Sequence, residues 1–286
     1  MTMRIIEKID DMKTVVQELK AQNRTVGFVP TMGYLHEGHL SLVRASINKA
    51  DFTIVSIFVN PTQFGPLEDL QEYPRDFSRD AELLRKEGVD LIFHPEVEEI
   101  YPQGFCTYVE VHGLQNKLCG KTRPLHFRGV CTVVLKLLNI IGPDFAFFGQ
   151  KDAQQSIIIK RMIRDLHLDI KIDVQPIVRD KDGLALSSRN SYLDADQRKA
   201  ALVLSRSLNL AREMIEKGER NSGKILEVIK NNINSESKGR LDYAEIVSLE
   251  NLEPVAVIKP GTLIALAVFI DKIRLIDNLI IRTEDM

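Results

Sequence analysis

The chain has 286 residues, of which 44% are hydrophobic and 27% are charged. This composition is close to the globular average, so it excludes a chain that is disordered throughout, and the length predicts about two domains. Lys and Arg together number 38 against 40 Asp and Glu, which leaves a net charge of −2. Such a balance excludes the broad basic surface that binds nucleic acid or an anionic membrane, although a local basic pocket remains possible.

The three cysteines, Cys106, Cys119 and Cys131, are odd in number, and no pair has the C-x-x-C spacing of a zinc or redox motif. We therefore expect buried, inert thiols in a reducing compartment. The apolar runs, such as Leu263 to Ile270, fall far short of the ~20 residues that a membrane helix needs. The first residues, MTMRIIEKIDDMK, carry acids where a signal peptide has its apolar core. These features predict a soluble cytoplasmic protein.

The first two-thirds of the chain alternates short apolar runs with helical patterns. The apolar runs are rich in β-branched residues, as in FTIVSIFV, which is typical of strands buried on both faces of a parallel sheet. The predicted strands are residues 24–29, 52–59, 89–93, 145–148 and 170–178. The predicted helices are residues 39–50, 79–88, 130–141 and 153–166. Repeated strand-then-helix units predict an α/β fold with a Rossmann-like, doubly wound parallel sheet.

The pattern changes near Arg179, after which helices precede strands. A long helix is predicted over residues 196–216, and Asp194 with Gln197 forms a capping-box pattern at its start. A second helix over 223–232 and strands over 241–247, 262–270 and 273–281 follow. We therefore predict a Rossmann-like domain over 1–176 and a smaller C-terminal α+β lid domain over 177–286.

The first predicted strand ends in PTMGYLHEGH, residues 30–39. Ligands of parallel sheets bind at the carboxyl ends of strands, where the next helix points its amide groups. His36 and His39 are three residues apart, so they share one face of the first helical turn and could donate hydrogen bonds to phosphate oxygens. A metal-binding pair or two structural capping histidines are the alternatives, and no H-E-x-x-H pattern completes a metal site.

This string resembles the nucleotide-binding signature of the pantothenate synthetase (pantoate–β-alanine ligase) family, within the wider H-x-G-H nucleotidyltransferase group. The resemblance covers nearly the whole chain, because further segments occur in the family's order and spacing. These segments are SIFVNPTQFGPLEDLQEYPRD (56–76), RPLHFRGVCTVVLKL (123–137), FFGQKDAQQ (147–155), LSSRNSYL (186–193) and RLIDN (274–278).

The resemblance implies a ligase that forms an amide bond in two steps. The carboxylate of pantoate attacks the α-phosphorus of ATP and releases pyrophosphate, and the amine of β-alanine then displaces AMP from the pantoyl adenylate. The residues implied to bind ATP are Met32, Gly33, Tyr34, Leu35, His36, Glu37, Gly38, His39, Gly149, Gln150, Lys151, Asp152, Val178, Leu186, Ser187, Ser188 and Arg189. Those implied to be catalytic are His36, His39, Lys151, Ser187, Ser188 and Arg189.

Individual roles follow from the same resemblance. His39 is the implied proton donor, Lys151 provides a point charge for the phosphates, and Asp152 accepts hydrogen bonds from the ribose. The segment from Ser187 to Arg189 clamps the triphosphate from the second domain, so that ATP is expected between the domains. Leu186 departs from the methionine usual in the family, and its similar volume should preserve backbone contacts to adenine.

Three amides are implied to hold pantoate, because an amide both donates and accepts hydrogen bonds. They are Asn60, Gln63 and Gln155. Asp80 is a weaker candidate, close to metal-bound phosphate. Arg123, His126 and Arg128 are expected to form a basic loop, either at the rim of the pocket or in subunit packing.

The expected partners are therefore ATP, pantoate and β-alanine. Mg²⁺ is expected to arrive with ATP and to have few protein ligands, because no dedicated metal site is visible in the sequence. The family resemblance suggests a homodimer. Two other functions use the same motifs: a nucleotidyltransferase that adenylylates a phosphate ester in one step, and a nucleotide sensor that binds ATP without turnover.

Overall fold

A computed structural model describes residues 3–66 and 68–286. Two compact units divide the chain. The first contains the described residues up to Gln115 together with Arg123–Gln150 and Ile158–Pro176, and the second contains Asn116–Thr122, Lys151–Ile157 and Ile177–Met286. The second unit therefore includes two short segments that precede residue 177. The division into functional domains over 1–176 and 177–286 stays a prediction.

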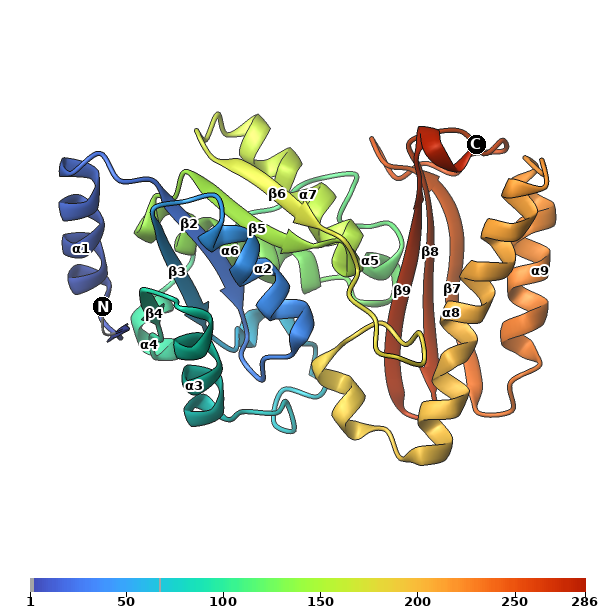
Figure 1. Cartoon of the computed structure of the whole chain (residues 1–286), viewed down its shortest axis with the longest axis horizontal. Coiled ribbons are helices and arrows are strands. Elements are labelled where there is room, and N and C mark those ends of the chain that lie inside the picture. Colours follow the sequence, from blue (N-terminus) through green and yellow to red (C-terminus); the bar gives the residue numbers. More distant parts are fainter. Residues whose placement is uncertain (1–2, 67) are drawn as a thin grey trace. The chain divides into compact units, whose positions relative to one another are not determined.

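The first unit is built on a six-stranded parallel sheet (Figure 1). Its strands follow the spatial order β1-β4-β3-β2-β5-β6. Their bounds are β1 Arg4–Ile6, β2 Val26–Thr31, β3 Phe52–Ile57, β4 Leu91–Phe93, β5 Phe145–Gly149 and β6 Lys171–Gln175. The predicted doubly wound sheet is confirmed. Strand β1 was not predicted, because three residues give too short a pattern to be read as a strand.

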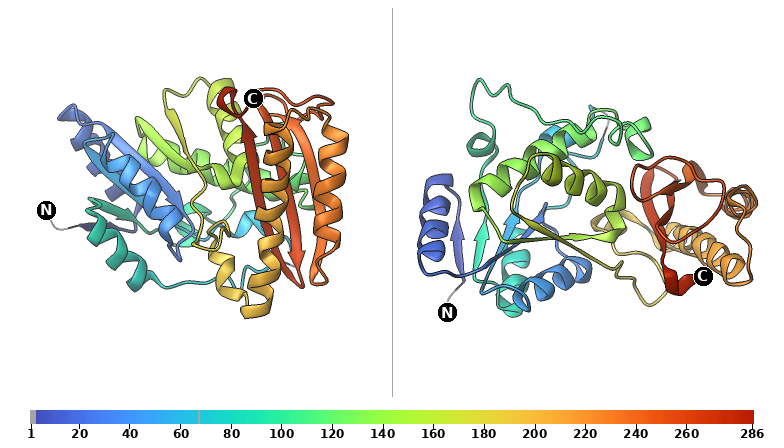
Figure 2. Two further views of the ribbon diagram at one scale, coloured as in Figure 1. Left: turned by 45° about the vertical axis from the view of Figure 1, so that its right-hand side comes forward. Right: turned by 90° about the horizontal axis from the view of Figure 1, so that it is seen from above.

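Helices cover both faces of this sheet (Figure 2). Their bounds are α1 Ile9–Ala21, α2 Glu37–Ile47, α3 Phe77–Glu87, α4 Val97–Ile100, α6 His126–Ile141 and α7 Ala153–Asp165. Helix α3 ends at Gly88, whose φ of 87° supplies the left-handed cap that the sequence predicts. Helix α6 begins four residues earlier than predicted, so the expectation that His126 and Arg128 lie in a loop is wrong.

The direction in which the chain adds strands to the sheet reverses between the neighbouring strands β2 and β5. Successive strands run outward from β2 to β3 and β4 on one side, and from β5 to β6 on the other. The order therefore reverses between β2 and β5, and ligands of such sheets bind beyond the carboxyl ends of the strands at this point. At the opposite, amino end of β2, the last turn of α2 packs closely on the strand, because a Cβ atom added to Gly27 would lie 2.2 Å from Oγ of Ser46.

The second unit combines an antiparallel sheet with two long helices (Figure 1). The bounds are β7 Gly239–Ser248, β8 Thr262–Ile270, β9 Ile273–Ile281, α5 Cys119–Thr122, α8 Ala195–Glu216 and α9 Ser222–Asn234. Helix α8 carries the predicted capping box, in which Asp194 accepts from the amide of Gln197 at 2.8 Å and Gln197 accepts from the amide of Asp194 at 3.1 Å. Aliphatic residues of both helices and of the sheet form one core.

Short 3₁₀ helices complete the structure, and three of them hold predicted site residues. They are η1 Pro61–Gln63, η2 Gln150–Asp152, η3 Ser188–Tyr192 and η4 Thr283–Asp285. Within residues 3–66 and 68–286, no helix is both long enough and apolar enough to cross a membrane.

The cysteine prediction is confirmed at two positions and wrong at the third. Cys119 and Cys131 are buried, and burial raises the pKa of Cys131 to about 12, which keeps this thiol protonated. Cys106 is exposed, because it lies in an irregular stretch after α4 that leaves most of its side chains on the surface.

Candidate active site

The turn after β2 carries the H-x-G-H segment and has an unusual backbone. Gly33 and Tyr34 both have positive φ angles, 81° and 48°. A Cβ atom on Gly33 would approach Oδ2 of Asp80 and Cγ2 of Ile57 to 3.1 Å. Only glycine combines this dihedral angle with so little space, so the residue allows the chain to turn tightly from the sheet into α2.

Asp80 holds this turn from helix α3. Its side chain is 1% exposed, and it accepts hydrogen bonds from the amides of Tyr34 at 2.6 Å and Leu35 at 2.8 Å. Burial raises the pKa of the Asp80 carboxyl, although both amides and the nearby Arg79 favour the ionised form. Arg79 also donates to the carbonyl of Leu35 at 2.9 Å. Asp80 therefore binds the backbone of the predicted ATP-binding segment.

His36 is the N-cap residue of α2 and His39 lies in its first turn, and both rings are oriented by backbone amides. Nδ1 of His36 accepts from the amide of Gly38 at 3.1 Å, and Nδ1 of His39 accepts from the amide of His36 at 3.3 Å. An imidazole whose Nδ1 accepts a hydrogen bond carries its proton on Nε2 when it is neutral. The ring centroids lie 4.0 Å apart, so the fold brings two Nε2–H donors together at a helix N-terminus.

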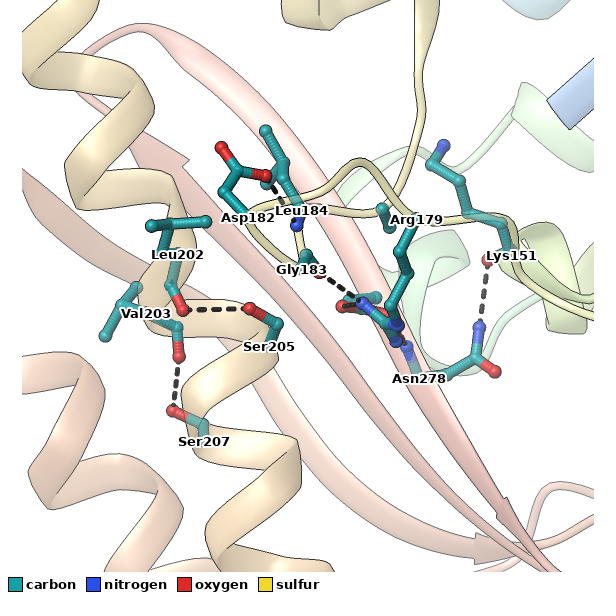
Figure 3. Close-up of polar contacts among 12 residues, drawn as sticks. Lys151, Arg179, Asp182, Gly183, Leu184, Leu202, Val203, Ser205, Ser207 and Asn278 are labelled. Atoms are coloured by element: carbon teal, nitrogen blue, oxygen red, sulfur yellow. Dashed lines mark hydrogen bonds and ion pairs between the residues drawn. The ribbon is translucent and has the colours of Figure 1, made fainter. Parts of the chain in front are cut away.

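The second predicted nucleotide segment follows β5. Among the described residues, and apart from the two neighbours of Gly149 in the chain, no atom lies within 4 Å of the position that a Cβ atom on Gly149 would occupy, so the backbone is open on that side. Gln150 and Lys151 are half-buried and Asp152 is exposed on η2. In the second unit, Nδ2 of Asn278 donates to the carbonyl of Lys151 at 3.0 Å (Figure 3). This hydrogen bond holds the backbone of Lys151 and does not involve the ammonium group of its side chain.

The third segment folds as a short hairpin within the second unit. The amide of Leu186 donates to the carbonyl of Val178 at 3.0 Å, and Arg179 pairs with Ala185 across the hairpin. Arg179 donates to both carboxylate oxygens of Asp277, at 2.7 and 2.9 Å, and to the carbonyl of Gly183 at 3.1 Å (Figure 3). Asp277 is 3% exposed, so this pair ties the hairpin firmly to β9.

The serines and arginine of LSSR start the 3₁₀ helix η3 directly after the hairpin. Ser187 is its N-cap, and its Oγ accepts from the amide of Arg189 at 3.3 Å. Ser188 is buried, whereas Arg189 is half-buried. Ser187 lines a small pocket of the second unit together with Lys151 and Asp277. Two residues predicted to bind phosphate, far apart in the sequence, therefore lie on the same pocket.

The three residues predicted to bind pantoate differ in burial and in hydrogen-bond partners. Asn60 is 1% exposed, and its Nδ2 donates to Oε1 of Gln63 at 3.0 Å. Gln63 in turn places Nε2 3.0 Å from the sulfur of Met32, which joins this pair to the H-x-G-H segment. Gln155 is half-buried on α7. Its neighbour Gln154 is buried and binds the backbone of Lys117 and Cys119 instead, so the two adjacent amides have different surroundings.

Two of the three basic residues around the start of α6, Arg123 and His126, meet the backbone of Gln63. Arg123 forms an ion pair with Glu68 and donates to the carbonyl of Gln63 at 3.4 Å, and Nδ1 of His126 lies 2.9 Å from the same carbonyl. Arg128 instead lies over the ring of Tyr108, 4.6 Å from its centroid. Burial alone would raise the pKa of Glu68, but the hydrogen bond and charge of Arg123 outweigh it and lower that pKa. Arg123 and His126 thus hold the backbone of Gln63, one of the residues predicted to bind pantoate.

The sequence did not identify Tyr101, Asp277 and Asn278, which contact predicted site residues or their neighbours. Tyr101 donates to Oδ1 of Asn60 at 2.8 Å, Asp277 binds Arg179, and Asn278 binds the backbone of Lys151. The segment RLIDN contains the last two, and their presence in it was the available signal. Among residues 3–66 and 68–286, no cluster of three or more His, Cys, Asp or Glu side chains is arranged to hold a metal ion.

Known proteins resemble the chain over almost its whole length. The sequence model described as pantoate-beta-alanine ligase matches residues 4–280. A pantothenate synthetase from Caldicellulosiruptor saccharolyticus is 56% identical over 98% of this chain and 99% of its own. One from Thermotoga neapolitana is 54% identical over 98% of this chain and 100% of its own.

Solved structures agree with these relatives. The crystal structure of pantothenate synthetase from Thermus thermophilus has a TM-score of 0.93 and 43% identity, and the match covers 98% of this chain and 100% of that one. Pantoate-beta-alanine ligase from Francisella tularensis, complexed with beta-gamma ATP and beta-alanine, has a TM-score of 0.80 and 36% identity over 97% of each chain. The chain belongs to the pantoate-beta-alanine ligase family.

Proposed function

We propose that this protein condenses pantoate with β-alanine to give pantothenate, consuming ATP and releasing AMP and pyrophosphate through a pantoyl adenylate. The observation that carries the proposal is the family match over residues 4–280. The pair of Nε2–H donors at the start of α2 supports it, because adenylation moves negative charge onto phosphate oxygens. ATP would enter as its Mg²⁺ complex, with the ion bound mainly by phosphate and water.

In the first step, a carboxylate oxygen of pantoate attacks the α-phosphorus and the bond to the β-phosphate oxygen breaks. His36 and His39 would donate to the phosphates, with His39 as the proton donor. Lys151, Ser187, Ser188 and Arg189 would bind the triphosphate, because an ammonium, two hydroxyls and a guanidinium match its oxygens. Charge leaves with the pyrophosphate, and these fixed donors stabilise it as it develops.

In the second step, the amine of β-alanine attacks the carbonyl carbon of the adenylate, and the bond to the phosphate oxygen breaks. AMP departs with that oxygen, and the amine loses a proton as the amide forms. Activation is needed because a free carboxylate has no adequate leaving group. The remaining ATP contacts would come from the backbone around Met32–Leu35, Gly149 and Gln150, from Asp152 at the ribose, and from Val178 and Leu186 at adenine. Gln63 and Gln155 would bind pantoate, and Asn60, which is 1% exposed and donates to Gln63, would help by holding Gln63 in place.

Exchange of labelled pyrophosphate into ATP tests the first step. We expect exchange only when pantoate is present, and AMP release only after β-alanine is added. Exchange without pantoate would contradict the proposal, and exchange that requires a phosphate ester instead would favour the single-step nucleotidyltransferase. Binding of ATP with no exchange under any condition would favour the nucleotide sensor.

We also propose that the protein works in the cytoplasm as a homodimer with a nucleotide-binding domain over 1–176 and a lid over 177–286. The three thiols, none of which is in a disulfide, support a reducing compartment. The homodimer rests on the family resemblance, and light scattering of the purified protein tests it: a mass of twice 32.5 kDa is expected, and a monomer mass would contradict it.

A further inference from the structure

The amide of Asn60 has a single possible orientation. One end lies 3.2 Å from the carbonyl of Gly129, which can only accept, so this end is the Nδ2 donor. The other end lies 3.4 Å from the backbone amide of Thr62, which can only donate, so this end is the Oδ1 acceptor. Since Asn60 is 1% exposed, these backbone groups determine its orientation without help from solvent.

Two hydroxyl groups reinforce this orientation. The hydroxyl of Tyr101 donates to Oδ1 of Asn60 at 2.8 Å, and Oγ1 of Thr62 donates to the same atom at 2.9 Å. Burial raises the pKa of Tyr101, so its phenol stays protonated and remains a donor at neutral pH. The Tyr101 contact comes from 41 residues away in the sequence, whereas Thr62 is a neighbour.

The ring of Tyr101 is itself held in place. Phe105 packs edge-on against it with centroids 5.0 Å apart, and Phe58 contacts it at 6.3 Å. The ammonium of Lys136 lies 5.6 Å from the Tyr101 centroid and 4.5 Å from that of Phe105. These packing contacts restrict the hydroxyl to one position, as a preorganised donor requires.

The orientation of Asn60 is transmitted to Gln63. Because Nδ2 of Asn60 donates at 3.0 Å, the atom of Gln63 that it meets must be the acceptor Oε1. The Nε2 group of Gln63 is then turned toward Met32, whose sulfur at 3.0 Å is only a weak acceptor. This NH₂ group can therefore donate to a stronger acceptor.

We propose that Tyr101 is a positioning residue which, through Asn60, makes Gln63 a hydrogen-bond donor toward an oxygen of the pantoate carboxylate or hydroxyl groups. The inference rests on the proposed function, because pantoate is the substrate that Gln63 would meet. Tyr101 does not touch the substrate itself. Its hydroxyl adds a buried donor to Oδ1 of Asn60 and so strengthens the orientation that the backbone groups of Gly129 and Thr62 set for the amide pair.

Tyr101→Phe tests the proposal, with Tyr108→Phe as the matched control. Tyr108 belongs to the same series of rings, since it packs against Phe105 at 5.3 Å, but it is 45% exposed. We expect Tyr101→Phe to raise the KM for pantoate about fivefold, as the loss of one hydrogen bond allows. The KM for ATP, kcat and the melting temperature should stay close to those of the control, because neither ring packing nor the ATP residues change.

Asn60→Asp is the stronger test, because it keeps the shape and replaces the donor by an acceptor. Gln63 would then have to turn its NH₂ group toward residue 60 and its oxygen toward the substrate. We expect the KM for pantoate to rise about 100-fold, since an oxygen would face an oxygen. Adding Thr62→Val to Tyr101→Phe should give an intermediate increase.

The outcomes separate this inference from the proposed function. A wild-type protein without pantoate-dependent exchange would overturn the proposed function and the inference with it. A wild-type protein that shows this exchange, with Tyr101→Phe equal to Tyr108→Phe in its KM for pantoate, would overturn the inference alone. An Asn60→Asp variant with an unchanged KM for pantoate would also overturn it.

Discussion

The two histidines of α2 are both held by backbone amides at Nδ1, which places both ring protons on Nε2. Glutamine carries its amide nitrogen near the position of Nε2, whereas asparagine carries its own near Nδ1. We expect His39→Gln to retain the adenylation rate within about tenfold, and His39→Asn or His39→Ala to lose about 100-fold. Single-turnover release of pyrophosphate measures the rate.

His112→Ala is the control for these variants, because its imidazole is 83% exposed. It should behave as the wild type does. Equal rates for His39→Gln and His39→Asn would show that the Nε2 proton has no special part in the step.

Asp80 is a second residue whose contacts make a definite prediction. Asn at this position offers one oxygen where two amides, those of Tyr34 and Leu35, now find two. We expect Asp80→Asn to lower the free energy of unfolding by about 1–3 kcal/mol, because one buried amide loses its acceptor. The KM for ATP should rise as well, since the loosened turn carries Met32 to His36.

Urea unfolding and steady-state kinetics measure these effects. Glu82→Gln is the matched control on the same helix, because its side chain is 60% exposed and pairs with the i+4 residue Lys86 on the surface. An Asp80→Asn protein as stable as this control would refute the role assigned to Asp80.

At the scale of elements, strand β9 holds two predicted ATP-binding segments. Successive strand residues point to opposite faces of a sheet. Asp277 points to the same face as the core residues Leu275 and Leu279 and binds Arg179 of the hairpin, whereas Asn278 binds the carbonyl of Lys151. One edge strand therefore orders both segments of the second unit.

We expect Asp277→Asn to raise the KM for ATP about tenfold, because the bidentate ion pair that fixes the hairpin becomes a weaker, neutral contact. Steady-state kinetics with varied ATP measures this. Asp242→Asn is the control, since Asp242 forms an ion pair with Arg274 on the same sheet, at 2.8 Å. A KM for ATP in Asp277→Asn that matches this control would contradict the assigned role of β9.

The elements were largely predictable because each has a local signal. Helix α8 has its capping box, α3 has Gly88, and β3 is an apolar run of β-branched residues. Helix α1 and strand β1 were missed although α1 has a buried stripe from Met12 to Leu19. Helix α6 was placed four residues too late because Leu125, its N-cap residue, makes no side-chain capping bond that would mark the start.

At the scale of the whole molecule, the site residues that sequence could not supply are those defined by distant contacts. Tyr101 meets Asn60 across 41 residues, and Arg179 meets Asp277 across 98. Helical and strand spacing in a sequence relates only residues that are close together along the chain. The family's motifs identified the groups expected to touch substrates, whereas the residues that hold those groups became visible only in the fold.

Acid stability reflects another pair that is distant in the sequence, Glu68 and Arg123. The pKa of Glu68 is lower in the folded protein than in an unfolded chain, so the ion pair with Arg123 stabilises the fold above the unfolded pKa of about 4.3. This stabilisation is lost as the pH falls through the lowered folded pKa. The difference in unfolding free energy between the wild type and Glu68→Gln should therefore be largest near neutral pH and shrink below about pH 4.

Urea unfolding at several pH values measures this difference. A difference that stays constant from neutral to acidic pH would contradict the role of the charged pair. Glu284→Gln is the control, because that carboxylate is 72% exposed, and its effect should be small at every pH.

In the proposed reaction, the carboxylate of pantoate attacks the α-phosphorus of ATP. Pantoate labelled with ¹⁸O in its carboxylate tests it most directly, because the oxygen that forms the anhydride leaves with AMP when β-alanine attacks the carbonyl carbon. Mass spectrometry of the products should find one ¹⁸O atom in AMP, one in pantothenate and none in pyrophosphate. Unlabelled AMP, or label in pyrophosphate, would contradict the adenylate mechanism.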